Sequence, residues 1–307
     1  MVLSLPGGDA LASWCEQWLG ARPVDVIFKS GHLSTVLGLR LADAREVVVK
    51  VRPDSPRISG CVEVQRRLWE SGFPCPRPLA GPAPLVAGIA TAEEYVRGGT
   101  QLERGGDSPI RFATLLWQLM DRCALLHVEH RLDPPPPWVS WDHTGPGVWA
   151  AASDSDADLN ADPEPRWLNE IGARTREILL AFRAPLVVGH VDWESQNIRW
   201  QDGQPLAVHD WDSAATRPEV TIVGAAAAVF ARTGEPGGAA TVEESELFFD
   251  AYQRERRGSF TKGELGAAWA AGLWVLAFDT KENTVNQRGD PEEFADEAWE
   301  RLRRASS

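Results

Sequence analysis

The sequence predicts an α+β protein in which an antiparallel sheet with one helix precedes a larger, mainly helical part. Two observations indicate this order. Short runs rich in β-branched residues occupy the first third of the chain, whereas apolar residues recur at helical spacing along much of the remainder. A third observation is the dipeptide Asp202-Gly203, which separates two short apolar runs and is typical of a hairpin turn. We therefore expect a small hairpin within the helical part.

The N-terminal sheet is expected to contain strands at residues 24–28, 36–41, 46–51 and 89–96, which are rich in β-branched and apolar side chains. A helix is predicted at residues 57–71, because Cys61, Val64 and Leu68 follow a helical spacing. The proline-rich residues 74–78 are expected to form an extended link between this helix and the last strand.

Helical spacing predicts further helices at residues 111–128, 220–232, 242–256 and 262–280. The last is apolar on nearly every face and should be buried. Its polar end at residues 279–283 fits either a substrate cleft or a helix end that faces water. His127 is expected to be a packed or capping residue. Residues 153–164 contain five acidic side chains and no basic ones, which favours a solvated loop over a lid that attracts a polycationic substrate.

Composition and charge exclude several classes of protein. With 43% hydrophobic residues the chain can bury a core, while its net charge of −13 argues against nucleic acid or an anionic membrane as a partner. The four cysteines show no metal-binding spacing, which indicates reduced and mostly buried thiols. Because no apolar run is long enough to span a bilayer and no signal peptide is evident, a cytoplasmic protein is expected. Nothing in the sequence indicates an oligomeric state.

The hairpin should bring three polar residues together at its open end. Asp192 precedes the first strand, Asn197 begins it, and Asp210 follows the second. With a two-residue turn, Asn197 is expected to lie opposite Val208, which places Asn197 and Asp210 close to each other. Carboxylate and amide oxygens suit Mg²⁺, and a further carboxylate suits a base for a substrate hydroxyl. This arrangement indicates phosphoryl transfer.

This segment resembles the catalytic core of the aminoglycoside phosphotransferase and choline kinase superfamily. Its members are related to protein kinases but phosphorylate small molecules. That family carries a His-Gly-Asp-x4-Asn loop followed by an Asp-Trp-acidic segment. The resemblance implies that Asp192 is the catalytic residue and that Asn197 and Asp210 bind the metal. Val191 stands where glycine is usual and would limit the freedom of the backbone. Asp212 replaces the usual Glu. It could bind a second metal, or it could be a solvated loop carboxylate. His190 is expected to pack against the loop and orient it.

The resemblance also assigns a phosphate-binding role to Lys50, which would meet the α- and β-phosphates. An ion pair with Glu63 of the following helix would hold its ammonium. The alternatives are a lysine that faces solvent and a surface pair between Glu63 and Arg67.

Two further nucleotide contacts are implied by position. Ser30, Gly31 and Ser34 belong to a loop that would offer backbone N–H groups and hydroxyls to the phosphates. An ordinary hairpin loop is the alternative. Backbone groups of Glu94 and Val96 would bind the adenine.

The resemblance therefore implies a bilobal protein-kinase-like fold, with the N-lobe at residues 1–97 and the C-lobe at residues 98–307. The implied activity is that of an ATP-dependent O-phosphotransferase, which moves the γ-phosphate of Mg-ATP to a hydroxyl of a small molecule. A cationic antibiotic such as an aminoglycoside is one candidate acceptor. A metabolic kinase for an amino alcohol or sugar, and a non-catalytic nucleotide-binding pseudokinase or regulatory module, remain as alternatives.

A protein kinase fits less well. Asp210 is followed by Trp211-Asp212 rather than Phe-Gly, and Arg217-Pro218-Glu219 comes too soon after it to leave room for an activation loop.

Overall fold

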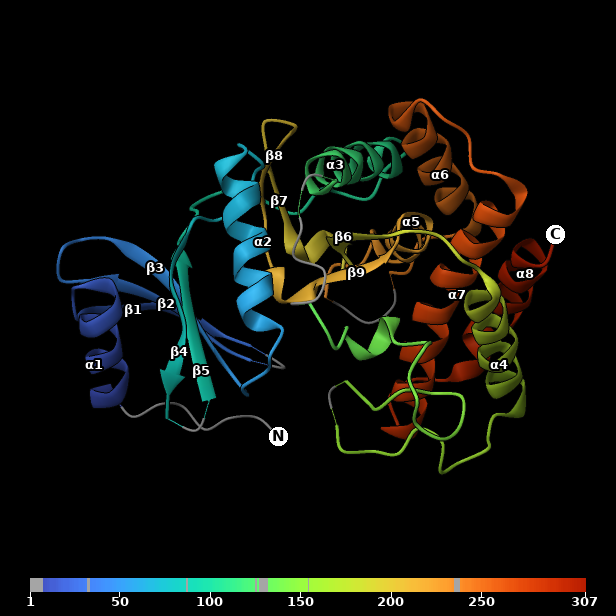
Figure 1. Cartoon of the computed structure of the whole chain (residues 1–307), viewed down its shortest axis with the longest axis horizontal. Helices are drawn as coiled ribbons and strands as arrows, with labels where there is room; N and C mark the ends of the chain where they lie inside the picture. Colours follow the sequence, from blue (N-terminus) through green and yellow to red (C-terminus); the bar gives the residue numbers. More distant parts are fainter. Residues whose placement is uncertain are drawn as a thin grey trace.

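The structure is a computed structural model that describes residues 8–31, 34–86, 88–124, 126, 132–153, 155–234 and 238–307. An antiparallel sheet with two helices forms one lobe, and a larger, mainly helical lobe follows it (Figure 1). The α+β class expected from the sequence is confirmed.

The N-terminal sheet has five strands in the order β1-β2-β3-β5-β4, and every neighbouring pair is antiparallel. The strands are β1 (Pro23–Ser30), β2 (Thr35–Leu41), β3 (Glu46–Arg52), β4 (Pro78–Leu85) and β5 (Gly88–Glu94). The four predicted strands are present, and β4 is an addition. Prolines hide β4 in the sequence, but it is an edge strand, where a missing N–H donor is tolerated.

Helix α1 (Gly8–Leu19), which the sequence analysis did not predict, covers one face of this sheet. Leu11, Trp14 and Cys15 of α1 share a buried cluster with apolar side chains of β2 and β3 such as Leu39 and Val49. Because side chains alternate along a strand, Lys50 and Arg52 of β3 face the opposite side, where they meet Asp210 and Asp212 of the helical lobe.

Helix α2 (Ile58–Glu70) lies between the sheet and the helical lobe (Figure 1). Ile58 and Val62 pack against the sheet, whereas Cys61 and Val64 belong to the core of the helical lobe. The apolar face predicted for this helix therefore points away from the sheet and joins the two lobes.

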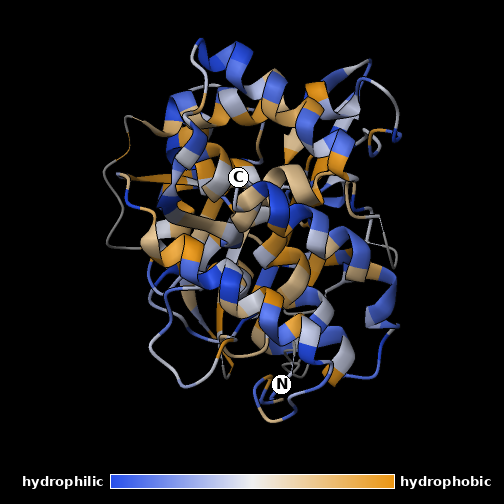
Figure 2. Ribbon diagram, turned by 90° about the vertical axis from the view of Figure 1, so that its right-hand side faces the viewer, coloured by the Kyte–Doolittle hydropathy of each residue, from blue (hydrophilic) through white to orange (hydrophobic). Residues whose placement is uncertain are grey.

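The helical lobe contains α3 (Ser108–Cys123), α4 (Arg166–Ala181), α5 (Glu219–Val229), α6 (Val242–Arg256), α7 (Lys262–Val285) and α8 (Ala295–Ala305). Helices α4 and α8 were not predicted, and α7 extends beyond the predicted end at residue 280. His127 lies outside the described residues. Hydrophilic and hydrophobic positions alternate along the helices that face the viewer in Figure 2, as expected for helices with one side in the core. Within the part of the chain that the structure describes, no helix could cross a membrane.

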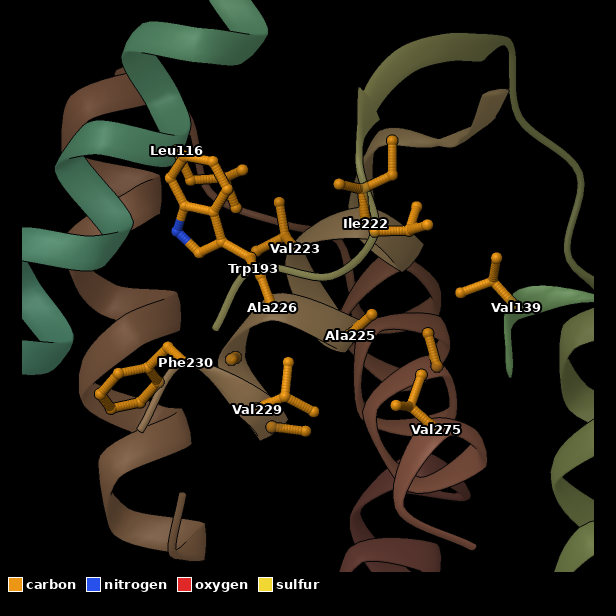
Figure 3. Close-up of a cluster of buried hydrophobic side chains, with 14 of the residues drawn as sticks. Leu116, Val139, Trp193, Ile222, Val223, Ala225, Ala226, Val229, Phe230 and Val275 are labelled. Atoms are coloured by element: carbon orange, nitrogen blue, oxygen red, sulfur yellow. The ribbon is translucent and has the colours of Figure 1, made fainter. Parts of the chain in front are cut away.

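Helices α5 and α7 form the centre of the helical lobe, and both are buried over most of their length. Figure 3 shows Val223 and Ala226 of α5, together with Phe230 just after this helix, in one cluster with Val275 of α7 and with Trp193. The two helices approach closely at Gly224, where an added Cβ would lie 1.9 Å from the Ala268 carbonyl oxygen. The close approach depends on the absence of a side chain at this position.

Replacing Gly224 by alanine is therefore expected to force α5 and α7 apart and to lower the free energy of unfolding by about 2 kcal/mol. Urea denaturation measures this change. Gly263→Ala, in the first turn of α7 where an added Cβ meets nothing, is the matched control and should not destabilise the protein. Equal stability of the two variants would contradict the close packing of these helices.

Candidate active site

Two pairs of antiparallel strands bring the predicted catalytic and metal-binding segments together. The first pair is β6 (Leu186–His190) with β9 (Ala214–Pro218), and the second is the hairpin β7 (Ile198–Gln201) with β8 (Gln204–Val208). His190 lies opposite Ala214, so the chain leaves β6 beside the point where it enters β9 and continues into the candidate catalytic loop, residues 191–197. The hairpin was predicted from the sequence, whereas the β6–β9 pair was not.

The hairpin turn at Asp202 is confirmed, but the expected register is wrong by one residue. Gln201 lies opposite Gln204 as a two-residue turn requires, and a bulge between Arg199 and Trp200 then shifts the pairing. The residue opposite Val208 is therefore Ile198 instead of Asn197. The two segments still meet at this end, because the Asn197 carbonyl accepts a hydrogen bond from the His209 amide at 2.8 Å.

Asp192 and Asn197 are in direct contact. Asn197 Nδ2 donates to Asp192 Oδ2 at 2.8 Å and to the Asp192 carbonyl at 3.0 Å. Since the amide nitrogen faces Asp192, the amide oxygen of Asn197 is left for another partner. Burial raises the pKa of Asp192 well above its usual range, the carboxylates of Glu194 and Asp210 raise it further, and the bond from Asn197 lowers it. Asp192 is thus a carboxylate whose affinity for a proton is increased by its surroundings.

The candidate catalytic loop is anchored by buried aromatic residues. His190 packs edge-on against the rings of Trp193 and Trp211, and its Nε2 lies 3.0 Å from the His209 carbonyl. Burial lowers the pKa of His190, so the imidazole is neutral, and its Nδ1 lies 3.3 Å from the donating amide of Asp192. The expectation that His190 packs and orients the loop is confirmed. Trp193 Nε1 donates to the Phe112 carbonyl at 3.2 Å, which fixes the loop to α3.

Val191 fits its position without strain. Val191 is described and does not have a positive φ, so its backbone does not need the conformational freedom of glycine. Its side chain is buried in the core of the helical lobe, its N–H donates to the Ser213 carbonyl, and its carbonyl accepts from Trp138 Nε1. The departure from the usual glycine therefore leaves the loop geometry intact.

Asp210 has a left-handed backbone, with φ 62° and ψ 51°, immediately before a short 3₁₀ turn at Trp211–Ser213. Such a conformation is uncommon for a residue other than glycine and is typical of functional positions. Its Oδ1 lies 3.8 Å from Lys50 Nζ, and its Oδ2 accepts from the Ser213 hydroxyl at 3.3 Å. Burial acts to raise the pKa of Asp210, but Lys50 and other donors outweigh it and hold the pKa below its usual value. Asp210 is therefore ionised.

The expected ion pair between Lys50 and Glu63 is wrong. Lys50 Nζ lies 3.7 Å from Glu93 Oε1, whereas Glu63 binds Arg66 and Arg67 on the outer side of α2. The reason is the rotation of about 100° per residue along a helix, which turns Glu63 away when Gln65 faces the sheet. The alternative for Glu63, a pair with Arg67, holds.

Lys50 does not face solvent. Lys50 is 8% exposed, and its ammonium lies between the carboxylates of Glu93 and Asp210. Burial lowers the pKa of Lys50, but Glu93, Asp210 and Asp212 together raise it above its ordinary value, so the ammonium is charged.

Asp212 forms an ion pair and is not a solvated carboxylate, while a role as ligand of a second metal stays a prediction. Its Oδ1 lies 2.7 Å from Arg52 Nη2, and the Arg52 side chain is only 7% exposed. Arg57 donates to the carbonyls of Asp212 and Ala214. Neither arginine was predicted from the sequence, although the alternation of residues 48, 50 and 52 along β3 puts Arg52 on the same face as Lys50.

A second group of charges lies beside Asp192. Arg232 Nη1 lies 3.2 Å from Glu194 Oε1 and 2.5 Å from Asp279 Oδ2. Glu194 is buried, which raises its pKa despite the nearby guanidinium. Asp279 belongs to the polar end of α7, where the sequence left a cleft or a water-facing helix end open. Arg232 links Asp279 to Glu194 of the candidate catalytic loop, so this end of α7 borders the candidate site.

The next residues of α7 hold the acidic segment in place. Lys281, fully buried, donates to the carbonyls of Asp162 at 2.7 Å and Glu164 at 3.0 Å, and Glu282 accepts from the amide and hydroxyl of Ser153. The segment between them is thus anchored at both ends. Its described acidic side chains, Asp156, Asp158, Asp162 and Glu164, are exposed, as expected for a solvated loop.

The residues expected to contact the nucleotide lie at the sheet. Ser30 ends β1, and Gly31 has φ 134°, where an added Cβ would lie 1.8 Å from the Ser34 carbonyl oxygen. His32 and Leu33 of this loop lie outside the described residues. At the other end of the sheet, the Glu94 N–H donates to the Arg77 carbonyl. The Val96 N–H has no backbone acceptor among the residues that the structure describes.

The described residues contain no group of three or more His, Cys, Asp or Glu side chains that could hold a metal by themselves. This fits Mg²⁺, which is commonly bound by one or two protein oxygens together with phosphate oxygens. Asp210 and Asn197 offer such a pair of oxygens.

Comparison with known proteins identifies the family. The sequence profile of the phosphotransferase enzyme family (APH) matches residues 26–257. The chain belongs to this family. Membership confirms the resemblance drawn from residues 190–212 and the prediction of a small-molecule kinase. No curated protein sequence matches the chain significantly.

Solved structures of similar shape support the same fold. Amicoumacin kinase hAmiN, in complex with AMP-PNP, Ca²⁺ and Ami, has a TM-score of 0.66 at 12% identity, over 93% of this chain and 89% of that one. Spectinomycin phosphotransferase APH(9)-Ia, in complex with ADP and spectinomycin, has a TM-score of 0.57 at 11% identity, over 96% and 93%. A choline/ethanolamine kinase family protein from Mesorhizobium loti has a TM-score of 0.53 at 15% identity, over 92% and 87%. At these identities the likeness shows the fold alone, and the protein-kinase-like fold is confirmed.

Breaking the pair between Arg52 and Asp212 should destabilise the protein. Arg52→Gln is expected to lower the free energy of unfolding by about 2 kcal/mol, less than the cost of breaking a fully buried pair, because the Asp212 side chain is 25% exposed. Urea denaturation measures the change. Arg22→Gln, which breaks an exposed pair with Glu16, is the control and should cost less than about 1 kcal/mol. If the two substitutions cost the same, Arg52 does not join the lobes as described.

Proposed function

We propose that the protein is an ATP-dependent O-phosphotransferase that moves the γ-phosphate of Mg-ATP to a hydroxyl of a small molecule. The observation that carries the proposal is the convergence of Asp192, Asn197, Asp210 and Lys50 at one place between the lobes. In this proposal residues 1–97 hold the nucleotide, and residues 98–307 carry the catalytic loop and the acceptor site.

Lys50 binds the phosphates of the nucleotide and offsets their charge, because its buried ammonium extends from β3 toward Asp210. The loop that contains Ser30, Gly31 and Ser34 covers the phosphates. The constrained backbone of Gly31 brings the chain close to the anion without a side chain in the way. At the hinge between the lobes, the Glu94 carbonyl and the Val96 N–H pair with the adenine.

Asn197 and Asp210 would hold Mg²⁺ through the free amide oxygen and the ionised carboxylate. When bound, the ion neutralises charge on the transferring phosphate. The left-handed backbone of Asp210 and the Asn197–Asp192 hydrogen bonds fix these oxygens in advance, so little reorganisation accompanies the reaction.

Asp192 orients the acceptor hydroxyl and takes its proton while the oxygen attacks phosphorus. Its raised pKa suits this role, since a carboxylate with a higher proton affinity is a better base for an alcohol. Asn197 holds the Asp192 side chain in one orientation. Few further groups are needed, because positioning and electrostatics supply most of the catalysis in phosphoryl transfer.

An acceptor that reaches Asp192 also meets the group formed by Glu194, Arg232 and Asp279. Together with Asp192, this group has three carboxylates and one guanidinium, an excess of negative charge beside the reacting hydroxyl. Such a surface favours an acceptor that carries an amine, which includes aminoglycosides and amino alcohols. Two of the solved structures named above hold a nucleotide together with a small molecule, Ami in amicoumacin kinase and spectinomycin in spectinomycin phosphotransferase, which supports a small-molecule acceptor.

The main test measures ADP release from Mg-ATP across a panel of hydroxylated compounds that includes aminoglycosides, amino alcohols and neutral sugars. Asp192→Asn should bind ATP within a few-fold of wild type but lose at least about 100-fold in turnover, because the base is missing. Asp121→Asn, an exposed carboxylate on α3, is the control and should match wild type. Equal turnover in Asp192→Asn and wild type would remove Asp192 from the mechanism.

The same panel distinguishes the alternatives. Turnover with an amine-bearing acceptor supports the proposed substrate class, whereas turnover with neutral sugars alone contradicts it. Tight binding of Mg-ATP with no turnover across the panel would favour a nucleotide-binding pseudokinase.

A second prediction concerns the metal. Asp210→Ala should lose the Mg²⁺-dependent part of ATP binding, because one of the two protein oxygens is removed. Calorimetric titration of ATP with Mg²⁺ and with EDTA measures this difference, and Asp121→Ala serves as the control. If Asp210→Ala keeps the full gain in affinity from Mg²⁺, the metal does not bind at Asp210.

A further inference from the structure

Lys50 and Glu93 lie on adjacent strands of the N-terminal sheet. Lys50 is opposite Thr91, and Val48 is opposite Glu93, in the pairing of β3 with β5. Positions two apart along a strand share a face, so Lys50 and Glu93 project from the same side of the sheet. Lys50 Nζ lies 3.7 Å from Glu93 Oε1, and the two side chains are 10% and 9% exposed. The ladder of backbone hydrogen bonds between the strands therefore fixes the geometry of this pair.

Helix α2 meets the pair through an amide. Gln65 Nε2 donates to Glu93 Oε2 at 2.9 Å and to the Pro76 carbonyl at 3.0 Å. One carboxylate oxygen of Glu93 thus pairs with Lys50, and the other accepts the hydrogen bond from Gln65 of α2. Within α2, all of which the structure describes, Glu63 binds two arginines and Glu70 is exposed at the last turn. No carboxylate of α2 pairs with the lysine.

We propose that Glu93 is the positioning residue for Lys50, in the role that a helix carboxylate has in protein kinases. This inference rests on the proposed function, because it concerns the lysine assigned to the phosphates. In protein kinases the helix can move and break the pair, which switches activity. Here the pair lies within one sheet, so a displacement of α2 leaves Lys50 in its working position.

Glu93 also keeps Lys50 from neutralising Asp210. The ammonium lies at nearly equal distances from the two carboxylates, 3.7 Å from Glu93 and 3.8 Å from Asp210. Without the charge of Glu93, Lys50 would pair with Asp210 alone, and Asp210 would be less available to a metal ion. Binding of the metal and the phosphates should then weaken, while binding of the adenine at the hinge should not.

The test compares Glu93→Gln with Glu63→Gln, the same chemical change on α2, and measures dissociation constants for Mg-ATP and for adenosine by displacement of a fluorescent nucleotide. Glu93→Gln should raise the Kd for Mg-ATP by about tenfold and leave that for adenosine unchanged. Glu63→Gln should stay within about twofold of wild type for both, because its partners are surface arginines. Both constants report only on folded protein, so partial unfolding does not produce this pattern.

Two further variants separate positioning from a merely structural role. Glu93→Asp keeps the charge and should regain part of the affinity for Mg-ATP. In a Lys50→Met background, Glu93→Gln should change that affinity by less than about twofold, because no ammonium remains to be held.

Wild-type affinity in Glu93→Gln, an equal loss in Glu63→Gln, or a loss that persists in the Lys50→Met background would each overturn the inference. A wild-type protein that does not bind Mg-ATP would contradict the proposed function itself.

Discussion

A lysine ammonium buried between carboxylates of both lobes is the interaction on which the rest of the site depends. Lys50 and Glu93 belong to the sheet, and Asp210 belongs to the helical lobe. Because an unpaired buried charge is costly, the lobes are held at the separation at which Asp210 reaches the ammonium. Arg52 and Arg57 add to this by binding the side chain and backbone of Asp212. The apolar sides of α2 fill the space around these ion pairs.

The fold was largely predictable where one local signal dominates. Helix α6 has the predicted bounds, 242–256, because Thr241 and Glu244 form a capping box at its start and a left-handed residue ends it. Strand β4 was missed because its prolines argue against a strand, and only its place at the sheet edge makes them acceptable. The pair β6–β9 is a long-range contact between short segments, which no local pattern specifies.

The site was predictable where spacing along the chain decides the geometry. Asp192 contacts Asn197, and Asp210 lies near enough to raise the pKa of Asp192, because one hairpin and its flanking residues bring them together even though the register differs by one residue. The partner of Lys50 was not predictable in this way, since the rotation of α2 relative to the sheet decides whether Glu63 or Gln65 faces inward. The charges at Arg52 and Arg232 were missed for a similar reason. Their partners are distant in sequence, and only tertiary packing makes them neighbours.

The anchoring of the acidic segment on α7 has a consequence for how this enzyme could change its acceptor over evolutionary time. Ser153 is bound at one end of the segment, and the carbonyls of Asp162 and Glu164 are bound at the other, by two consecutive residues of a buried helix. The chain between these anchors can gain, lose or exchange residues without disturbing the catalytic loop, because its ends remain fixed. New acceptor contacts can thus be acquired in this segment while the phosphate-transfer machinery is inherited unchanged.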